Sequence, residues 1–265
     1  AGKARLPERA VVPPGATLEV EMANASFAYG GQTVAEMTFP LEGEVVIVEE
    51  GPLKTSADFR MREADAYPQL YQESAARKTK DKAINVLQGR SVGGSTTVNW
   101  TSCFRTPATT LAHWQREFGL KDLTVEAMAP WFDAVDRRLS IRYWDLSPNE
   151  NNNLLRQAAW KLGVSVAPIR RNVKGCWNLG YCGMGCPTNA KQSMLVTTLP
   201  AALAAGATLV HHLRAERLVM AGDRIEALDG VAMEAAGIRP LPWRVRLRAK
   251  QFVRAAGATG TPALL

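Results

Sequence analysis

Apolar and polar residues follow two kinds of spacing along this chain, and the difference separates expected strands from expected helices. Residues 18–22 alternate apolar and charged side chains, which suits a half-buried strand. Residues 44–51 form a β-branched run that ends in acids and a glycine, as a buried parallel strand does when it enters a turn. Two strands joined by a hairpin are expected over residues 208–219 and 224–233, and one more over residues 246–254.

Helical spacing of aromatic residues predicts helices over residues 107–140, with Pro130 standing between two segments. A further helix is expected over residues 151–163, because asparagines stand at its start and Gly163 stands at its end. Strands therefore alternate with helices along the chain. This order predicts an α/β fold: a Rossmann-like parallel sheet for FAD or NAD(P), with inserted helices and a β-meander.

Composition narrows the class of protein without specifying it. The 265 residues are 46% apolar and 22% charged, which is ordinary for a globular protein of one large or two small domains. No uninterrupted apolar run reaches the roughly 18 residues that a spanning helix needs, although a membrane surface stays open as a partner. The net charge of +7 suits solvated surface or attraction for anions. Basic residues are not interleaved with aromatics, so we expect no nucleic-acid partner.

Glu49 is the first residue with a chemical interpretation. An acid at the end of the second strand of a doubly wound sheet accepts hydrogen bonds from both ribose hydroxyls of a dinucleotide. That arrangement favours FAD or NAD and disfavours a 2′-phosphate. Glu50 follows directly and should point to the opposite side of the strand. The alternative is that both acids simply end a strand.

A glycine-rich stretch over residues 87–100 is the second feature. Gly93 and Gly94 allow the backbone to approach a ligand closely, and Ser95 and Thr96 offer hydroxyls and amides to phosphate oxygens. The stretch would also suit a glycine turn with Ser and Thr caps and no ligand.

Three segments together resemble the glucose–methanol–choline (GMC) family of FAD-dependent oxidoreductases. Residues 89–105 resemble the signature Gly-Arg-x-x-Gly-Gly-Ser-x-x-x-Asn that wraps the flavin. Residues 171–193 resemble a cysteine-containing stretch of the long-chain-alcohol and gluconate-dehydrogenase-like branch. Residues 254–265 resemble the strand and Ala-Ala-Gly turn that return to the FAD. The resemblance covers about residues 44–265, and the order of the motifs makes it specific.

The resemblance implies FAD as the cofactor and a set of residues that hold it. These are Glu49 at the ribose; Gly89, Arg90, Gly93, Gly94, Ser95 and Thr96 at the pyrophosphate and flavin; Asn99 and Trp100 beside the isoalloxazine; Ala215 at the adenine; and Ala256 and Gly257 in a turn against the dinucleotide. The implied activity is oxidation of a small alcohol or polyol by hydride transfer to the flavin, with the electron acceptor open. The family's histidine base has no match here, so no catalytic residue is assigned, and an inactive truncated or rearranged fragment is the alternative.

The first 43 residues depart from the family pattern. The family opens with a strand and Gly-x-Gly-x-x-Gly, but Ser26 and Ala28 stand at the first two glycine positions and only Gly31 matches. We therefore expect an atypical β-rich segment over residues 1–43. Residues 44–265 are expected to form a FAD-binding domain of GMC type, truncated before the family's substrate domain.

Cys176, Cys182 and Cys186 form the remaining cluster. Thiolates hold zinc or iron–sulfur clusters, but three ligands fall short of a closed tetrahedral zinc site, and the usual Cys-x2-Cys pairs are missing. A three-iron cluster and plain structural thiols are both open. We favour structural thiols and assign no metal ligand.

Overall fold

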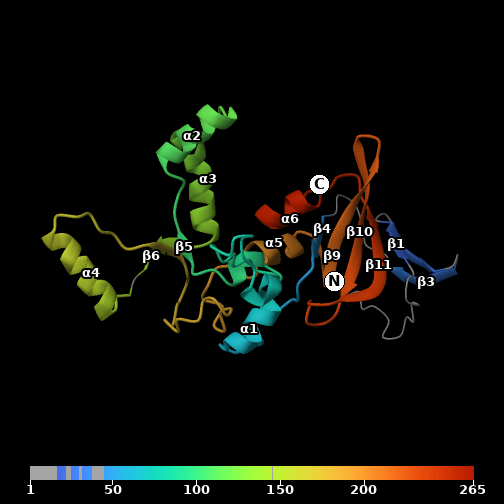
Figure 1. The fold of residues 1–265 in the computed structure, drawn as a ribbon, viewed down its shortest axis with the longest axis horizontal. Coiled ribbons are helices and arrows are strands. Elements are labelled where there is room, and N and C mark those ends of the chain that lie inside the picture. Colours follow the sequence, from blue (N-terminus) through green and yellow to red (C-terminus); the bar gives the residue numbers. More distant parts are fainter. Residues whose placement is uncertain (1–16, 22–24, 30–31, 38–44, 145) are drawn as a thin grey trace. The chain divides into compact units, whose positions relative to one another are not determined.

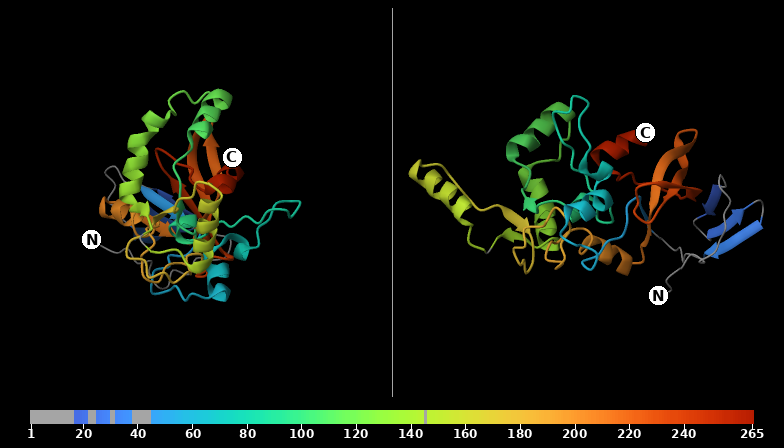
Figure 2. Two further views of the ribbon diagram at one scale, coloured as in Figure 1. Left: turned by 90° about the vertical axis from the view of Figure 1, so that its left-hand side faces the viewer. Right: turned by 60° about the horizontal axis from the view of Figure 1, so that its bottom comes forward.

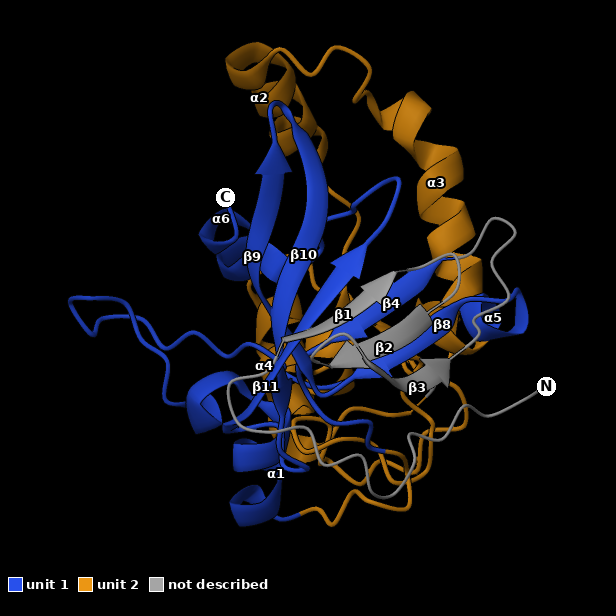
Figure 3. Cartoon of the chain, turned by 90° about the vertical axis from the view of Figure 1, so that its right-hand side faces the viewer, with its two compact units in different colours: residues 1–54, 62–92, 201–265 blue, residues 55–61, 93–200 orange. Residues whose placement is uncertain are grey.

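The computed structural model of the chain describes residues 17–21, 25–29, 32–37, 45–144 and 146–265 (Figure 1). The chain divides into two compact units, each built from separate stretches of sequence (Figure 3). Unit 1 comprises residues 1–54, 62–92 and 201–265, and unit 2 comprises residues 55–61 and 93–200. The domain boundary expected near residue 43 stays a prediction.

Unit 1 contains a parallel pair of strands where the dinucleotide-binding core was expected. β4 (Val46–Glu49) lies beside β8 (Thr208–His211), with Glu49 opposite His211. The β-branched residues of β4 favour this extended backbone because their side chains restrict χ1. The strand predicted over residues 44–51 is confirmed, and it ends at the expected acid.

The β-meander of unit 1 consists of β9 (Leu213–Ala221), β10 (Arg224–Met233) and β11 (Pro240–Arg248), paired antiparallel (Figure 2). Its buried apolar side chains come from all three strands and include Leu213, Ala227, Val231, Met233 and Leu247. Alternate residues of these strands face this core, which is the period expected for a sheet with one covered face.

Two strand predictions need correction here. The run over residues 208–219 is two strands, because His212 adopts a left-handed φ of 60° and turns the chain from β8 into β9. The strand expected over residues 246–254 starts at Pro240 and ends at Arg248, where the pairing with Ala227 of β10 also ends. Hydrogen bonding to β10 therefore sets these limits, and the apolar pattern does not.

Three N-terminal strands extend the meander into a six-stranded sheet of order β3-β2-β1-β11-β10-β9. β1 (Thr17–Glu21) pairs parallel with β11, followed by β2 (Ala25–Tyr29) and β3 (Gln32–Met37) in antiparallel order. Ser26 and Ala28 therefore lie in an extended strand, and Gly31 lies outside the described residues. The strand predicted over residues 18–22 is confirmed as far as Glu21.

The helices of unit 1 are short. α1 (Glu63–Leu70) buries Ala66 and Leu70, and a 3-10 helix, η1 (Gln72–Ala75), follows it. α6 (Gly257–Ala263) begins three residues after Arg254, the end of the stretch that was expected to be a strand. α5 (Thr198–Ala204) spans the point where the chain leaves unit 2 for unit 1.

Unit 2 carries the longer helices and a small antiparallel sheet of order β5-β7-β6. Its elements in chain order are η2 (Gly94–Thr97), β5 (Ser102–Cys103), α2 (Ala108–Phe118), α3 (Val125–Arg138), β6 (Ile141–Tyr143), α4 (Glu150–Lys161) and β7 (Arg170–Asn172). The helices predicted over residues 107–140 and 151–163 are confirmed, the latter with Asn149 as its N-cap.

Pro130 does not separate α2 from α3, as its sequence position had suggested. It lies inside α3, while the break falls at Gly119, whose φ is 65°, and at Thr124. The Thr124 side chain accepts a hydrogen bond from the Ala127 N–H, so the helix begins there. A proline removes one helical hydrogen bond, and α3 accommodates that loss.

Candidate cofactor site

Glu49 stands at the carboxyl end of the parallel pair in unit 1, and its side chain is largely buried. The Gly51 N–H donates a hydrogen bond to Glu49 Oε1 at 2.8 Å. Burial raises the pKa of Glu49 to about 7, and the negative charge of Glu50 adds to the rise, while the Gly51 hydrogen bond opposes it. The Glu49 carboxyl has lost most of its hydrating water, and hydroxyl groups of a ligand would supply the hydrogen bonds that this water would have made.

The turn after β4 requires glycine at position 51, because the backbone of Arg90 and Ser91 runs directly against it. A Cβ on Gly51 would lie 2.7 Å from the Ser91 Cα. The approaching segment is hydrogen-bonded in place, since the Val92 N–H donates to the Pro52 carbonyl at 3.1 Å and the Arg90 N–H donates to the Leu70 carbonyl at 2.7 Å. The first part of the glycine-rich motif thus lies next to the turn that follows Glu49.

Arg90 is a buried cation with an unused donor. It is 6% exposed, its Nη2 donates to the Pro68 carbonyl at 2.9 Å, and its Nε has no partner among the described residues. The hydroxyl of the neighbouring Ser91 is also buried and has no hydrogen-bond partner among the described residues. Buried donors without partners are costly, so these two groups fit an anionic, oxygen-rich ligand.

A hollow of about 340 Å³ in unit 1 includes Arg90 in its wall. The other lining side chains are mostly polar: Glu50, Gln72, Glu73, Ser74, Arg77, Arg214, Met233 and Ile238. Glu50 accepts a hydrogen bond from Gln72 Nε2, and Arg77 donates to Glu73 at 2.8 Å. Three guanidinium groups and two carboxylates line the hollow, so the formal charge of its wall is positive by one.

The other expected contacts of unit 1 lie on the meander and on α6. Ala215 lies in β9 opposite Gly230, and Gly89 forms an isolated bridge with Tyr71. Ala256 is the N-cap residue of α6 and Gly257 is its first residue. The start of α6 is fastened by Thr259, whose hydroxyl donates to Gln88 Oε1 at 2.8 Å, one residue before Gly89.

The glycine turn that begins unit 2 has the geometry expected from its sequence. Gly93 has a φ of 92°, and a Cβ there would lie 2.9 Å from the Leu195 Cβ. Gly94 opens the 3-10 helix η2 with a φ of 57°. The Thr96 hydroxyl donates to the Gly93 carbonyl at 2.5 Å and accepts from the Met194 N–H at 3.0 Å. Thr96 therefore stabilises the turn with its side chain, which leaves its backbone for ligand contact.

Asn99 and Trp100 follow η2 and present their side chains to solvent. The ring of Trp100 is 57% exposed, and Asn99 Oδ1 accepts a hydrogen bond from the Thr101 N–H at 3.3 Å. Ser95, two residues after Gly93, is also accessible. The flat indole and the amide are groups that suit contact with a planar ring.

Two cations of unit 2, the buried Lys191 and the half-buried Arg171, were missed by sequence reasoning. Lys191 and Arg171 both contact the loop that carries Asn99 and Trp100. Both lie within the cysteine-containing segment that resembles the family, but a lysine or arginine in a loop is ordinarily exposed. The residues on either side of them in the sequence do not predict that these two side chains are shielded from solvent.

The three clustered cysteines are reduced and lie in separate hydrogen-bonding environments. Cys176 Sγ accepts from the Asn178 N–H, Cys186 Sγ accepts from the Lys191 N–H, and Cys182 Sγ lies 3.7 Å from an Arg171 nitrogen. Within the described ranges, no three His, Cys, Asp or Glu side chains are arranged to hold a metal ion.

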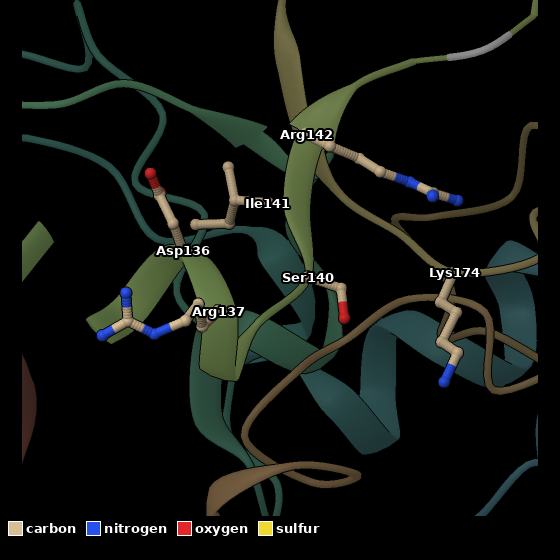
Figure 4. Close-up of a pocket in the computed structure, with 6 residues that line it drawn as sticks. All are labelled: Asp136, Arg137, Ser140, Ile141, Arg142 and Lys174. Atoms are coloured by element: carbon tan, nitrogen blue, oxygen red, sulfur yellow. The ribbon is translucent and has the colours of Figure 1, made fainter. Parts of the chain in front are cut away.

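A second hollow of about 340 Å³ lies in unit 2 between the end of α3, β6 and Lys174. Figure 4 shows that Arg137 and Arg142, two of its basic lining residues, point to opposite sides. Asp136, a further lining residue, is already paired with Arg105 at 2.5 Å and Arg170 at 2.9 Å. The polar groups do not converge, so this hollow is not a candidate site.

Fold and site together define an α/β flavoprotein-type oxidoreductase domain. Solved structures share this fold: the structure of pyridoxine 4-oxidase from Mesorbium loti matches with a TM-score of 0.58 and 19% identity over 83% of this chain and 46% of that one. Formate oxidase from Aspergillus oryzae matches with a TM-score of 0.55 and 14% identity, over 96% of this chain and 48% of its own. These likenesses confirm the predicted fold class.

The sequence comparisons identify the family. The family model described as GMC oxidoreductase matches residues 67–265. An uncharacterized GMC-type oxidoreductase of Mycobacterium tuberculosis is 36% identical over 239 residues, which cover 89% of this chain and 37% of the relative. Long-chain-alcohol oxidase FAO3 of Arabidopsis thaliana is 27% identical over 248 residues, covering 89% of this chain and 32% of the relative. The chain belongs to the GMC oxidoreductase family, and it spans about a third of the length of these relatives.

No helix within the described ranges is long and apolar enough to cross a membrane.

Proposed function

We propose that this chain supplies most of the FAD-binding part of an oxidoreductase that acts on the CH–OH group of a small alcohol or polyol. FAD, when bound, supplies the acceptor for the hydride of the alcohol carbon. The observation that carries the proposal is the buried Arg90, whose unpartnered Nε lies in a chain that belongs to the GMC family. An electron acceptor is not assigned.

The residues present fit such a cofactor in unit 1. The Glu49 carboxylate would accept hydrogen bonds from ribose hydroxyls, and the Arg90 guanidinium and Ser91 hydroxyl would donate to oxygen atoms of the pyrophosphate. Ala215 and the start of α6 at Ala256 and Gly257 would present backbone to the adenosine half.

In unit 2, the turn at Gly93 and Gly94 exposes backbone that no Cβ covers, and Ser95 and Thr96 follow with their amides. Asn99 and Trp100 would bound the ring from exposed positions on the next loop. Oxidation also requires that a proton leave the alcohol hydroxyl. We assign that step to no residue of this chain.

The test compares Glu49→Gln with Glu50→Gln in the purified chain, titrated with FAD while flavin fluorescence is followed. Glu49 is the last residue of β4, while Glu50 lies in the following bend and already accepts a hydrogen bond from Gln72 Nε2, so we expect only the Glu49 carboxylate to reach the ribose. We expect Glu49→Gln to cost about 1–3 kcal/mol of binding free energy, the scale of a charge-assisted hydrogen bond.

Glu50→Gln is the matched control, because Glu50 lines the polar hollow next to Glu49. A smaller loss from Glu50→Gln supports the assignment. Equal losses, or a loss from Glu50→Gln alone, would show that the ribose acid has been placed on the wrong residue. If the wild-type chain does not bind FAD, the proposed function itself is wrong.

A further inference from the structure

Lys191 of unit 2 is a buried lysine that the proposed function does not use. It is 3% exposed, and its backbone forms an isolated antiparallel bridge with Val173. Lysine is almost never fully buried unless it is paired. The groups that influence its pKa, besides burial, are Cys182, Cys186 and Arg171, so no carboxylate of the described residues neutralises it.

Three backbone carbonyls take the place of a carboxylate. Lys191 Nζ donates to the Thr97 carbonyl at 2.8 Å, to the Asn99 carbonyl at 2.8 Å and to the Cys182 carbonyl at 2.6 Å. A protonated amine has three hydrogens, and each has an acceptor here. A neutral amine has two hydrogens, so one carbonyl would lose its partner.

Two of these carbonyls, those of Thr97 and Asn99, come shortly before a residue with an unusual backbone conformation. Thr101 adopts a φ of 64°, which is rare for a β-branched residue, and it is 0% exposed. Its hydroxyl accepts from Arg171 Nε at 2.7 Å, and the Trp100 carbonyl accepts from Arg171 Nη2 at 3.3 Å. Strained backbone of this kind persists only where the surroundings fix it.

The side chains of Asn99 and Trp100 are exposed and add little support of their own, since their one hydrogen bond among the described residues is the 3.3 Å bond from the Thr101 N–H to Asn99 Oδ1. The orientation of these two residues therefore depends on their backbone carbonyls. Lys191 donates to the carbonyl of Asn99, and Arg171 donates to the carbonyl of Trp100. Arg171 is fixed in turn, because its guanidinium lies 4.4 Å from the centroid of the Trp144 ring.

We propose that Lys191 is the positioning residue of the flavin loop: its ammonium group fastens the backbone of residues 97–99 to the cysteine loop at Cys182 and so aims Asn99 and Trp100 at the ring. The inference rests on the proposed function, since it takes FAD to be the ligand of this loop. Lys191 acts on the ring through Asn99 and Trp100 and does not itself touch it.

The experiment compares the wild-type chain with Lys191→Met, and uses Lys174→Met as the control. Lys174 is exposed, and only its backbone N–H, bonded to the Ala190 carbonyl, contributes to the loop. The readouts are the Kd for FAD and the visible circular dichroism of bound flavin at saturating FAD. We expect Lys191→Met to weaken FAD binding about tenfold or more and to change the dichroism, and Lys174→Met to do neither.

Lys191→Arg keeps a permanent charge and several donors, so it should restore part of the affinity and of the dichroism. A purely structural lysine would lower the melting temperature but leave the spectrum of the flavin that still binds unchanged. An unaltered Kd and spectrum in Lys191→Met would overturn the inference. If Lys191→Met does not fold, Lys191→Gln, which keeps two amide hydrogens, replaces it with the same expectations.

Hydrogen exchange of the FAD-free chain separates this inference from the proposed function. We expect faster exchange over residues 97–103 in Lys191→Met than in the wild type or Lys174→Met. A wild-type chain that binds no FAD would end the proposed function and the aiming of the ring, while faster exchange would still establish the fastening of the loop. Unchanged exchange would refute the fastening as well.

Discussion

At the scale of single residues, Glu49 is subject to two opposing demands. A carboxylate at the end of β4 is what ribose hydroxyls require, yet burial makes its ionised form unfavourable and raises its pKa to about 7. A raised folded-state pKa means that this residue stabilises the fold most when it is protonated, below about pH 4.5, and that this stabilisation is lost as the pH rises through about 7. The cofactor-free chain therefore bears a cost at neutral pH.

Glu49→Gln should consequently make the cofactor-free chain more stable at pH 8. Glutamine keeps an oxygen for the Gly51 N–H and has no charge to bury. The gain in unfolding free energy should approach about 3 kcal/mol at pH 8 and shrink strongly at pH 5, where the wild-type carboxyl is mostly protonated. Urea unfolding at the two pH values measures it. An equal gain at both values would mean that ionisation of Glu49 is not the cause.

At the scale of elements, one carboxylate joins the three strands of the meander. Asp229 of β10 lies opposite Arg217 of β9 and Arg246 of β11 in the strand register. Arg246 donates to it at 2.6 and 3.0 Å, and Arg217 at 2.5 Å. Hydrogen bonds from Arg246, followed by those from Arg217, lower the pKa of Asp229 to about 2, although partial burial opposes the shift.

Asp229→Asn should therefore destabilise the chain at neutral pH by about 1 kcal/mol, because the network is only partly shielded from solvent. A lowered folded-state pKa means that the stabilisation is present above about pH 4 and is lost as the pH falls through about 2. The difference from wild type should thus vanish near pH 2 in denaturant titrations. Asp223→Asn, in the exposed turn between β9 and β10, is the control; a comparable loss there would argue against the network.

At the scale of the whole molecule, stretches of the two units alternate along the sequence. Unit 1 is assembled from three stretches and unit 2 from two. The proposed cofactor residues follow this division. Glu49, Gly89, Arg90, Ala215, Ala256 and Gly257 belong to unit 1, while Gly93, Gly94, Ser95, Thr96, Asn99 and Trp100 belong to unit 2. The residues proposed for the ribose and the adenine thus belong to unit 1, and those proposed beside the isoalloxazine belong to unit 2.

FAD should accordingly stabilise the chain against heat, and FMN, which lacks the adenosine half, should do so far less. A ligand present at 100 times its Kd adds about 2.7 kcal/mol to the folded state. Thermal melts at rising FAD concentration should show a progressive increase in melting temperature. If FMN raised it as much as FAD, the adenosine contacts that we assign to unit 1 would be wrong.

The sequence by itself determined the types of element and the family. The β-branched run of β4, the amphipathic helices α2 to α4 and the β9–β10 hairpin are each encoded by neighbouring residues, whose period reports which face is buried. The glycine motif before Asn99 is equally local, because a tight turn depends on the backbone freedom of the residues within it.

Only the tertiary structure decided which strand pairs with which and which polar groups are buried. Residues 208–219 read as one strand, but a single left-handed residue, His212, divides them between two sheets. β11 ends at Arg248, where its pairing with Ala227 of β10 ends, and no local pattern records that limit. Lys191 lies buried because the carbonyls of residues 97 and 99, more than 90 positions earlier in the chain, accept hydrogen bonds from its ammonium group. Contacts between distant residues depend on the packed chain, and hydrophobic periodicity carries no information about them.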